Sequence, residues 1–383
     1  MPKFIHKQFK TILNKQKYID NWFWTRYSIN PYNGCQFGCI YCDGRSERYR
    51  MQDAFSETIV IKENVGEMLD QRISRARALL PDVVGFGGVT DGYQPIEQKA
   101  MNTRTILEVL HKHRFPVHML TKSKLVLNDL ELFEAIGQQS WATVSVTLTT
   151  LNPDIAKIIE PRASTPEERL DIIRQFKKLA PHVQTGFLLM PMIPGLTDKR
   201  DDIKIYLRTI QDAGADYCLF SGLTMRDRQA DYFLKRIHDH YPEALKQMEP
   251  LYHFQYEPDF YQGQYTASEG YQKMLNEMML ELCGQVEMPF YVKRFIPNDF
   301  RRTNYTLAET ILNTSFKRQL QGGNWYDLFW TGQHIQNMKE PIEDVAARNE
   351  LETIPNVKGK LLEYIKKEVK PSPSQITLFD RET

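Results

Sequence analysis

Residues 29–42 read INPYNGCQFGCIYC, and this short segment contains three of the five cysteines of the 383-residue chain, Cys35, Cys39 and Cys42. Gly34 and Gly38 allow the backbone to curl, so that the three thiolates can converge on one centre. Three cysteines can ligate three irons of a 4Fe–4S cluster and leave the fourth iron without a protein ligand. A small molecule can then chelate that iron and receive an electron.

Two alternatives to such a cluster stay open for the cysteine triplet. A structural zinc site usually has two close Cys or Cys/His pairs, but no histidine or fourth cysteine lies near this loop. The thiols could also be free and buried. An odd number of cysteines, with Cys218 and Cys283 standing alone, indicates metal ligation by reduced thiols rather than a disulfide framework.

Beyond this loop, short apolar runs alternate with longer helical patterns between residues 80 and 225. The predicted strands are Val83–Gly88, Val117–Thr121, Ala142–Thr149, Val183–Met190 and Tyr217–Ser221. The predicted helices are Gln98–Lys112, Val126–Ile136, Pro166–Leu179 and Lys199–Ala213. Strands that alternate with helices predict an α/β fold with a parallel sheet.

Polar and glycine-rich segments follow the ends of these predicted strands. They include residues 88–91, 121–123, 147–150, 191–195 and 221–222. Such residues are also common in ordinary βα loops. In a barrel-like sheet they would lie on the C-terminal rim, where active sites are assembled.

The spacing Cys-x3-Cys-x2-Cys, with Tyr41 before the last cysteine, resembles the radical S-adenosylmethionine (radical SAM) superfamily. Segments NPYNGCQFGCIYC, GGVTDGYQPIEQ, LTKS and IIEPRASTPEERL are similar to its spore photoproduct lyase-like branch. The resemblance covers about residues 25–225. It implies a partial (β/α)6 barrel, with a 4Fe–4S cluster and S-adenosylmethionine as cofactors. It also implies reductive cleavage of S-adenosylmethionine to methionine and a 5′-deoxyadenosyl radical, which abstracts hydrogen from a substrate.

The resemblance also implies roles for individual residues. Cys35, Cys39 and Cys42 correspond to the cluster ligands. The positions that correspond to S-adenosylmethionine contacts are Tyr41 beside the adenine, Thr90 and Asp91 at the methionine end, Lys122 at the methionine carboxylate, and Ser145 and Thr147. A solvated surface position is the alternative for Lys122.

Two departures from the lyase pattern bear on the reaction. Gly88 stands where spore photoproduct lyases have a cysteine that donates a hydrogen atom, and Asp43 stands where they have a tyrosine. Cys218 could replace the missing donor only if its side chain points into the barrel; the alternative is a small core residue.

Composition and charge place the chain among ordinary globular enzymes. Apolar residues make up 42% and the formal net charge is +1, so any basic surface must be local. No apolar stretch reaches the roughly 18 residues of a membrane span, and the N-terminus lacks a signal-peptide core, so we expect a cytoplasmic protein without membrane contact.

We expect an N-terminal extension (1–24), the barrel (25–225), an α-rich C-terminal region that completes or covers it (226–370) and a flexible tail (371–383).

Two segments suggest that the substrate is DNA. Between Tyr291 and Tyr305, cations alternate with aromatic residues, and the candidate phosphate contacts are Lys293, Arg294, Arg301 and Arg302. Packing of these aromatics on the barrel is the alternative.

The tail contains Gln375, Leu378 and Phe379, which resemble the short peptide by which bacterial proteins bind the DNA sliding clamp. A tail that folds back on its own domain remains the other interpretation.

The sequence therefore favours a radical SAM enzyme, lyase-like, that repairs or modifies DNA. The same chemistry on RNA, a peptide or a small molecule is the first alternative, and a non-catalytic DNA- or clamp-binding protein with a structural metal site is the second. An external electron donor such as flavodoxin or ferredoxin is an expected partner.

Overall fold

The computed structural model describes residues 2–49, 55–76 and 79–369. These residues form two compact units. The first comprises the described residues of 2–17 and 25–293, and the second comprises 18–24 and 294–369. The boundary near residue 293 groups residues 226–293 with the barrel, whereas the sequence suggested a boundary at 225.

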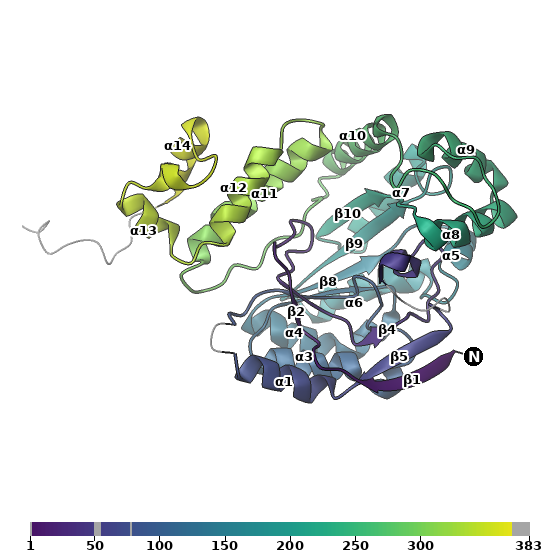
Figure 1. The fold of residues 1–383 in the computed structure, drawn as a ribbon, viewed down its shortest axis with the longest axis horizontal. Coiled ribbons are helices and arrows are strands. Elements are labelled where there is room, and N and C mark those ends of the chain that lie inside the picture. The colour runs from purple at the N-terminus through teal and green to yellow at the C-terminus, as the bar shows by residue number, and fades with distance from the viewer. Residues whose placement is uncertain (1, 50–54, 77–78, 370–383) are drawn as a thin grey trace, which may run out of the picture. The chain divides into compact units, whose positions relative to one another are not determined.

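Within the described residues, a seven-stranded sheet in the first unit has the order β10-β9-β8-β7-β6-β3-β2. Figure 1 shows its strands β10, β9 and β8 side by side. The strands are β2 (Asn14–Lys15), β3 (Tyr27–Ile29), β6 (Val84–Phe86), β7 (Val117–Thr121), β8 (Ala142–Thr147), β9 (Val183–Met192) and β10 (Tyr217–Gly222). All neighbours from β3 to β10 pair in parallel, and β2 pairs antiparallel with β3. Six parallel strands in chain order confirm the predicted partial (β/α)6 barrel.

A second, three-stranded sheet in the described part of this unit has the order β1-β5-β4. Its strands are β1 (Lys3–Gln8), β4 (Tyr32–Asn33) and β5 (Thr58–Glu63). Strand β4 pairs antiparallel with β5 and leads directly into the cysteine loop. This sheet therefore fixes the backbone at the start of that loop.

The helices of the first unit follow the strands along the chain. They are α1 (Val65–Ser74), α2 (Glu97–Ala100), α3 (Asn102–Lys112), α4 (Leu130–Gln139), α5 (Pro153–Ile159), α6 (Pro166–Leu179), α7 (Arg200–Asp212), α8 (Asp227–His240), α9 (Pro242–Tyr252) and α10 (Glu269–Gln285). Helix α6 has the predicted bounds because Thr165 and Glu168 form a capping box and Pro166 occupies the first turn.

The predicted helix Gln98–Lys112 is interrupted. Met101 adopts φ +52° between α2 and α3. The Glu97 carboxylate accepts the backbone N–H groups of Thr103 (2.8 Å) and Arg104 (3.2 Å). Side-chain capping of α3 thus replaces the backbone bonds that would have continued the first helix.

The two faces of the large sheet differ in chemistry. Ser145, Gly186 and Tyr217 are register partners, so they share a face. On that face the Ser145 hydroxyl lies 2.6 Å from both the His118 ring and the Tyr217 hydroxyl, and all three side chains are buried. Cys218 lies in register with Phe187 on the opposite face.

The second unit is helical in its described part, as the predicted α-rich extension requires. It contains α11 (Arg302–Leu320), α12 (Tyr326–Gln336), α13 (Ile342–Ala347) and α14 (Gly359–Glu368). Residues 18–24 belong to this unit because Gln333 of α12 donates a hydrogen bond to the Ile19 carbonyl (2.8 Å) and the Tyr18 and Trp330 rings meet edge to face.

Candidate active site

The backbone of the cysteine loop depends on two glycines in the left-handed region. Gly34 has φ +81° and Gly38 has φ +67°. A Cβ atom would lie 2.4 Å from the Thr58 carbonyl oxygen at the first position, and 2.6 Å from the Arg162 guanidinium at the second. The close backbone carbonyl and the left-handed φ both require glycine at position 34, and the left-handed φ favours it at position 38.

Three side chains from outside the loop hold its backbone groups. Gln94 accepts the N–H of Gln36 (2.9 Å) and donates to the Gly34 carbonyl (3.2 Å). Arg45 donates to the carbonyls of Gly38 and Cys39, both at 3.1 Å. Gln229 of α8 donates to the Tyr41 carbonyl (3.0 Å). Sequence reasoning identified none of these residues, although Gln94 lies within the motif GGVTDGYQPIEQ.

The three thiols lie near enough to one another to interact, as ligands of one cluster must. All three are free, with Cys35 and Cys39 buried and Cys42 partly exposed. Burial raises the pKa of Cys35 to about 12, and it also raises the pKa values of Cys39 and Cys42. The described residues contain no group of three His, Cys, Asp or Glu side chains close enough to hold one ion. Cysteines that each bind a different iron do not need to meet at one point.

Lys122 and Asp91 come together beside the cysteine loop. The Lys122 ammonium lies 5.9 Å from the centre of the Tyr41 ring. Burial alone would lower the pKa of Lys122, but its neighbours Cys39, Glu160 and Asp91 outweigh that effect and raise it. The sequence alternative of a solvated lysine does not describe this partly buried position.

The Asp91 carboxylate is used to join two strand ends. One oxygen accepts the Tyr93 N–H and the Thr121 hydroxyl, and the other accepts the Lys122 N–H, all at 2.8 Å. Thr90 is buried and donates to the Tyr32 carbonyl (3.1 Å). Both residues therefore position the loops that carry Lys122 and the cysteines.

Ser145 and Thr147 have different surroundings. The Ser145 hydroxyl lies in hydrogen-bond distance of His118 and Tyr217, and its role as a cofactor contact stays a prediction. Thr147 lies at the C-terminal end of β8, and its carbonyl accepts a hydrogen bond from Arg169 (3.0 Å).

A buried ion pair adjoins Tyr41 and was not predicted from the sequence. The Tyr41 hydroxyl donates to one Glu160 oxygen, and Arg169 approaches the other at 2.5 Å. Arg169 also donates to the Ser164 carbonyl (2.8 Å). Glu160 and Arg169 thereby connect the last turn of the cysteine loop with the end of β8.

Cys218 does not satisfy the condition set for a hydrogen-atom donor. It is fully buried on the sheet face that carries Phe187 and Leu189, opposite to Ser145 and Tyr217. Burial raises its pKa, and Cys283 of α10 adds to that effect. The alternation of side chains along β10 therefore places this thiol against the helical layer.

Two of the four predicted DNA contacts in residues 293–302 are buried. Arg294 is buried, with its guanidinium 4.8 Å from the Trp24 ring and 3.9 Å from the Tyr305 ring. Arg301 is buried and paired with Asp299 at 2.6 Å. Lys293 and Arg302 are exposed. Two of the four cations therefore stabilise the protein interior instead of a surface for phosphates.

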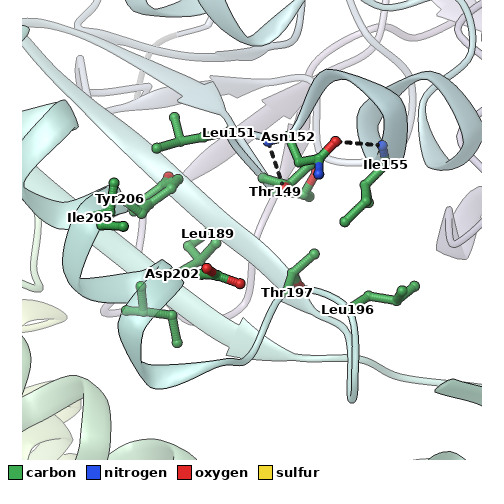
Figure 2. Close-up of a pocket in the computed structure, with 12 residues that line it drawn as sticks. Thr149, Leu151, Asn152, Ile155, Leu189, Leu196, Thr197, Asp202, Ile205 and Tyr206 are labelled. Atoms are coloured by element: carbon green, nitrogen blue, oxygen red, sulfur yellow. Dashed lines mark hydrogen bonds between the residues drawn. The ribbon is translucent and has the colours of Figure 1, made fainter. Parts of the chain in front are cut away.

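A separate cavity of about 320 Å³ lies where α5 and α7 meet β9 (Figure 2). Leu189, Leu196 and Ile203 contribute apolar walls, and Thr149 and Tyr206 line it with buried hydroxyl groups that have no hydrogen-bond partner in the described structure. The rim segment 147–150 thus contributes Thr149 and Thr150 to this cavity on the helical side of the sheet.

Two further sequence predictions concern membranes and the tail. No helix in the described part of the chain has both the length and the apolar character to cross a membrane. Gln375, Leu378 and Phe379 lie outside the described residues.

Comparison with known proteins defines the class. Residues 29–207 match the model of the Radical SAM superfamily, and this part of the chain is a radical SAM domain. Members of this superfamily use a 4Fe–4S cluster and S-adenosylmethionine, and they need an external electron donor. The prediction of a radical SAM domain with a 4Fe–4S cluster and S-adenosylmethionine as cofactors is therefore confirmed.

The similar proteins are distant in sequence. An uncharacterized protein of Mycobacterium tuberculosis strain H37Rv is 27% identical over 267 residues, which cover 69% of this chain and 75% of the relative. One from Methanocaldococcus jannaschii is 30% identical over 174 residues, covering 45% of this chain and 62% of the relative. A solved spore photoproduct lyase, complexed with dinucleoside spore photoproduct, has a TM-score of 0.52 at 16% identity and covers 74% of this chain and 79% of its own. That likeness establishes the common fold.

Proposed function

We propose that this radical SAM enzyme acts on DNA, either by repairing a lesion or by modifying a base. The radical SAM chemistry in this proposal rests on the cysteine loop, which presents three free thiols near Lys122. Support for DNA comes from the fold shared with a lyase that was solved with a dinucleoside photoproduct.

In this proposal Cys35, Cys39 and Cys42 hold the 4Fe–4S cluster. When bound, the cluster and S-adenosylmethionine supply a 5′-deoxyadenosyl radical able to remove a hydrogen atom from the substrate. Lys122 binds the methionine carboxylate, for which a compact ammonium is suited. Tyr41 would contact the adenine, and Thr147 would contact the cofactor from the end of β8. Thr90 and Asp91 hold the methionine-side loop in place.

The proposed reaction differs from that of spore photoproduct lyase in its final hydrogen transfer. Gly88 carries no thiol, and a Cβ atom there would meet nothing within 4 Å. Cys218 lies on the other face of the sheet. A hydrogen atom from the substrate or from an external thiol, or an electron from a reductant together with a proton from solvent, would therefore complete turnover.

The test compares substrates for their effect on S-adenosylmethionine cleavage. The anaerobically reconstituted enzyme is given a chemical reductant and an oligonucleotide: irradiated DNA, unirradiated DNA or RNA of the same sequence. We expect irradiated or unirradiated DNA, but not RNA, to increase 5′-deoxyadenosine formation. Stimulation by RNA alone, or by no nucleic acid, would contradict the DNA assignment while leaving the enzyme class in place.

We further propose that the tail binds the sliding clamp. The basis is the sequence of Gln375, Leu378 and Phe379 alone. An immobilised bacterial clamp should retain the wild-type chain but not the Leu378→Ala/Phe379→Ala variant. Equal retention of the two would remove this part of the proposal.

A further inference from the structure

Four side chains gather at the end of β10, next to the cysteine loop. They are Arg48 and Tyr49 in the turn that follows the loop, Arg226 before α8, and Tyr265 in the segment between α9 and α10. We call these four residues the rim patch. Tyr49 is 36% exposed and Tyr265 is 41% exposed, so both rings are available to a ligand.

Hydrogen bonds tie the three segments of the rim patch together. Thr224 pairs with Thr266, and the Met225 N–H donates to the Tyr265 carbonyl at 2.9 Å. Thr224 also donates to the Asp43 carboxylate (3.2 Å), one residue after the third cysteine. These bonds fix Tyr265 beside the cysteine loop.

The loop side of the patch is fixed by α8. Ser46 donates to the Asp227 carboxylate (2.7 Å), and Arg228 donates to the Arg45 carbonyl (2.8 Å). Burial raises the pKa of Tyr49, whose interacting neighbours are Asp43, Arg48, Tyr265 and Cys42. The patch is thus a preformed surface close to Cys42. Asp43 and Asp227 accept hydrogen bonds from Thr224 and Ser46, and Asp43 also interacts electrostatically with Arg48 and Arg226.

The chemistry of the patch matches a nucleotide. The Arg226 guanidinium lies 4.3 Å from the centre of the Tyr265 ring, which gives a paired cation and aromatic platform. Nucleic-acid strands are held by cations at the phosphates and by aromatic rings on which bases stack. An enzyme that reacts with a base must also bring that base out of the duplex.

We propose that the rim patch binds a DNA strand and stacks an extruded base beside Cys42. Arg48 and Arg226 contact phosphates, while Tyr265 and Tyr49 stack on bases. This inference rests on the proposed function and specifies where its substrate binds. The two arginines of the rim patch take the role of phosphate contacts that the sequence had suggested for Arg294 and Arg301, which are buried.

The experiment measures binding of a fluorescent 12-nucleotide single-stranded DNA, and of RNA with the same sequence, to the cluster-loaded full chain. Tyr265→Ala should weaken DNA binding about tenfold, because each stacked base contributes substantially to affinity. Tyr265→Phe keeps the ring and should bind within about twofold of wild type. Arg226→Gln should reduce the slope of log affinity against log salt by about 0.7, the value for one phosphate of a single strand. Phe4→Ala is the matched control, since Phe4 is 40% exposed in β1 and lies outside both the patch and the segment 291–305.

The outcomes separate this inference from the proposed function. If wild type binds DNA and Tyr265→Ala binds equally well, the rim patch is wrong and DNA remains the substrate. If wild type binds only RNA, and Tyr265→Ala weakens that binding, the patch is supported as a strand-binding surface and the DNA assignment is contradicted. If wild type binds neither strand, both are overturned. Unfolding curves of the variants establish that each is folded, and the Arg226→Gln slope tests the patch independently of Tyr265.

Discussion

At the scale of single residues, the Glu160–Arg169 pair holds the cysteine loop against the barrel. Both side chains are almost completely buried, and Glu160 also accepts the Tyr41 hydroxyl. Breaking such a pair from one side leaves an uncompensated charge in the interior, which costs more than the intact pair contributes.

We therefore predict that Glu160→Gln destabilises the protein by about 3–5 kcal/mol. The glutamine can still accept from Tyr41, but it leaves Arg169 without its counter-charge. Urea unfolding monitored by circular dichroism gives the free energy of unfolding. Glu57→Gln is the control, because Glu57 is 57% exposed and its partner Arg162 is 41% exposed. Loss of such an exposed ion pair should lower the free energy of unfolding by only about 0.5 kcal/mol. Equal effects of the two substitutions would contradict the structural role of Glu160.

A second residue-scale prediction concerns pH. Burial lowers the pKa of Lys62 to about 8, whereas an unfolded lysine has a pKa of about 10.4. Between these values the unfolded chain binds more protons than the folded one, so stability rises with pH. Below about pH 8 the folded protein carries the full cost of the buried charge.

Lys62→Met should remove this dependence. From about pH 8 to 10.5, the wild type should gain up to about 3 kcal/mol relative to the variant. Urea unfolding at several pH values measures this difference, and Lys7→Met, at the exposed register partner in β1, is the control. A constant difference between wild type and Lys62→Met would show that Lys62 is not desolvated.

At the scale of elements, the turn after β6 sets the position of Thr90 and Asp91. Gly87 has φ +81°, and a Cβ atom there would lie 2.1 Å from the Leu120 carbonyl oxygen. The next residue, Gly88, has open space around it. Position 87 therefore requires glycine, whereas position 88 has room for a side chain.

Gly87→Ala should destabilise the protein by about 2 kcal/mol or more, because backbone strain and a backbone clash add. Gly88→Ala should change stability by no more than about 0.5 kcal/mol. Thermal unfolding of both variants provides the comparison. Equal unfolding temperatures for the two variants would contradict the close approach of Gly87 to the Leu120 carbonyl oxygen.

The sequence predicted long elements well and short ones poorly. Strand β7 and helix α6 have the predicted bounds because apolar runs and a capping box mark them locally. Strand β3 was missed since its three residues are defined by pairing with β6, more than fifty positions away. The break at Met101 also depends on a side-chain contact, that of Glu97 with α3.

At the scale of the whole molecule, parallel topology explains which site residues were predictable. Asp91 and Lys122 follow neighbouring strands, β6 and β7, whose C-terminal ends meet at one edge. Gln94, Gln229 and Glu160 were missed because their partners are loop backbone groups or a hydroxyl distant in sequence. No local pattern marks such contacts.

The same reasoning explains the errors. A sequence in which cations alternate with aromatic residues is the same whether these side chains face solvent or pack inside the protein. Arg294 and Tyr305 stack on each other in the interior. The orientation of Cys218 depends on strand register, which composition does not determine. These positions required the folded structure.

The central claim is that three thiolates alone anchor a 4Fe–4S cluster with an open iron. The direct measurement is the iron and sulfide content of anaerobically reconstituted protein, with the electron paramagnetic resonance spectrum of the reduced protein before and after S-adenosylmethionine is added. Wild type and Cys218→Ser/Cys283→Ser should each bind about four irons and four sulfides, and the spectrum should change on addition. Cys35→Ser/Cys39→Ser/Cys42→Ser should bind none. A cluster retained by the triple variant, or a single zinc ion in the wild type, would contradict the account.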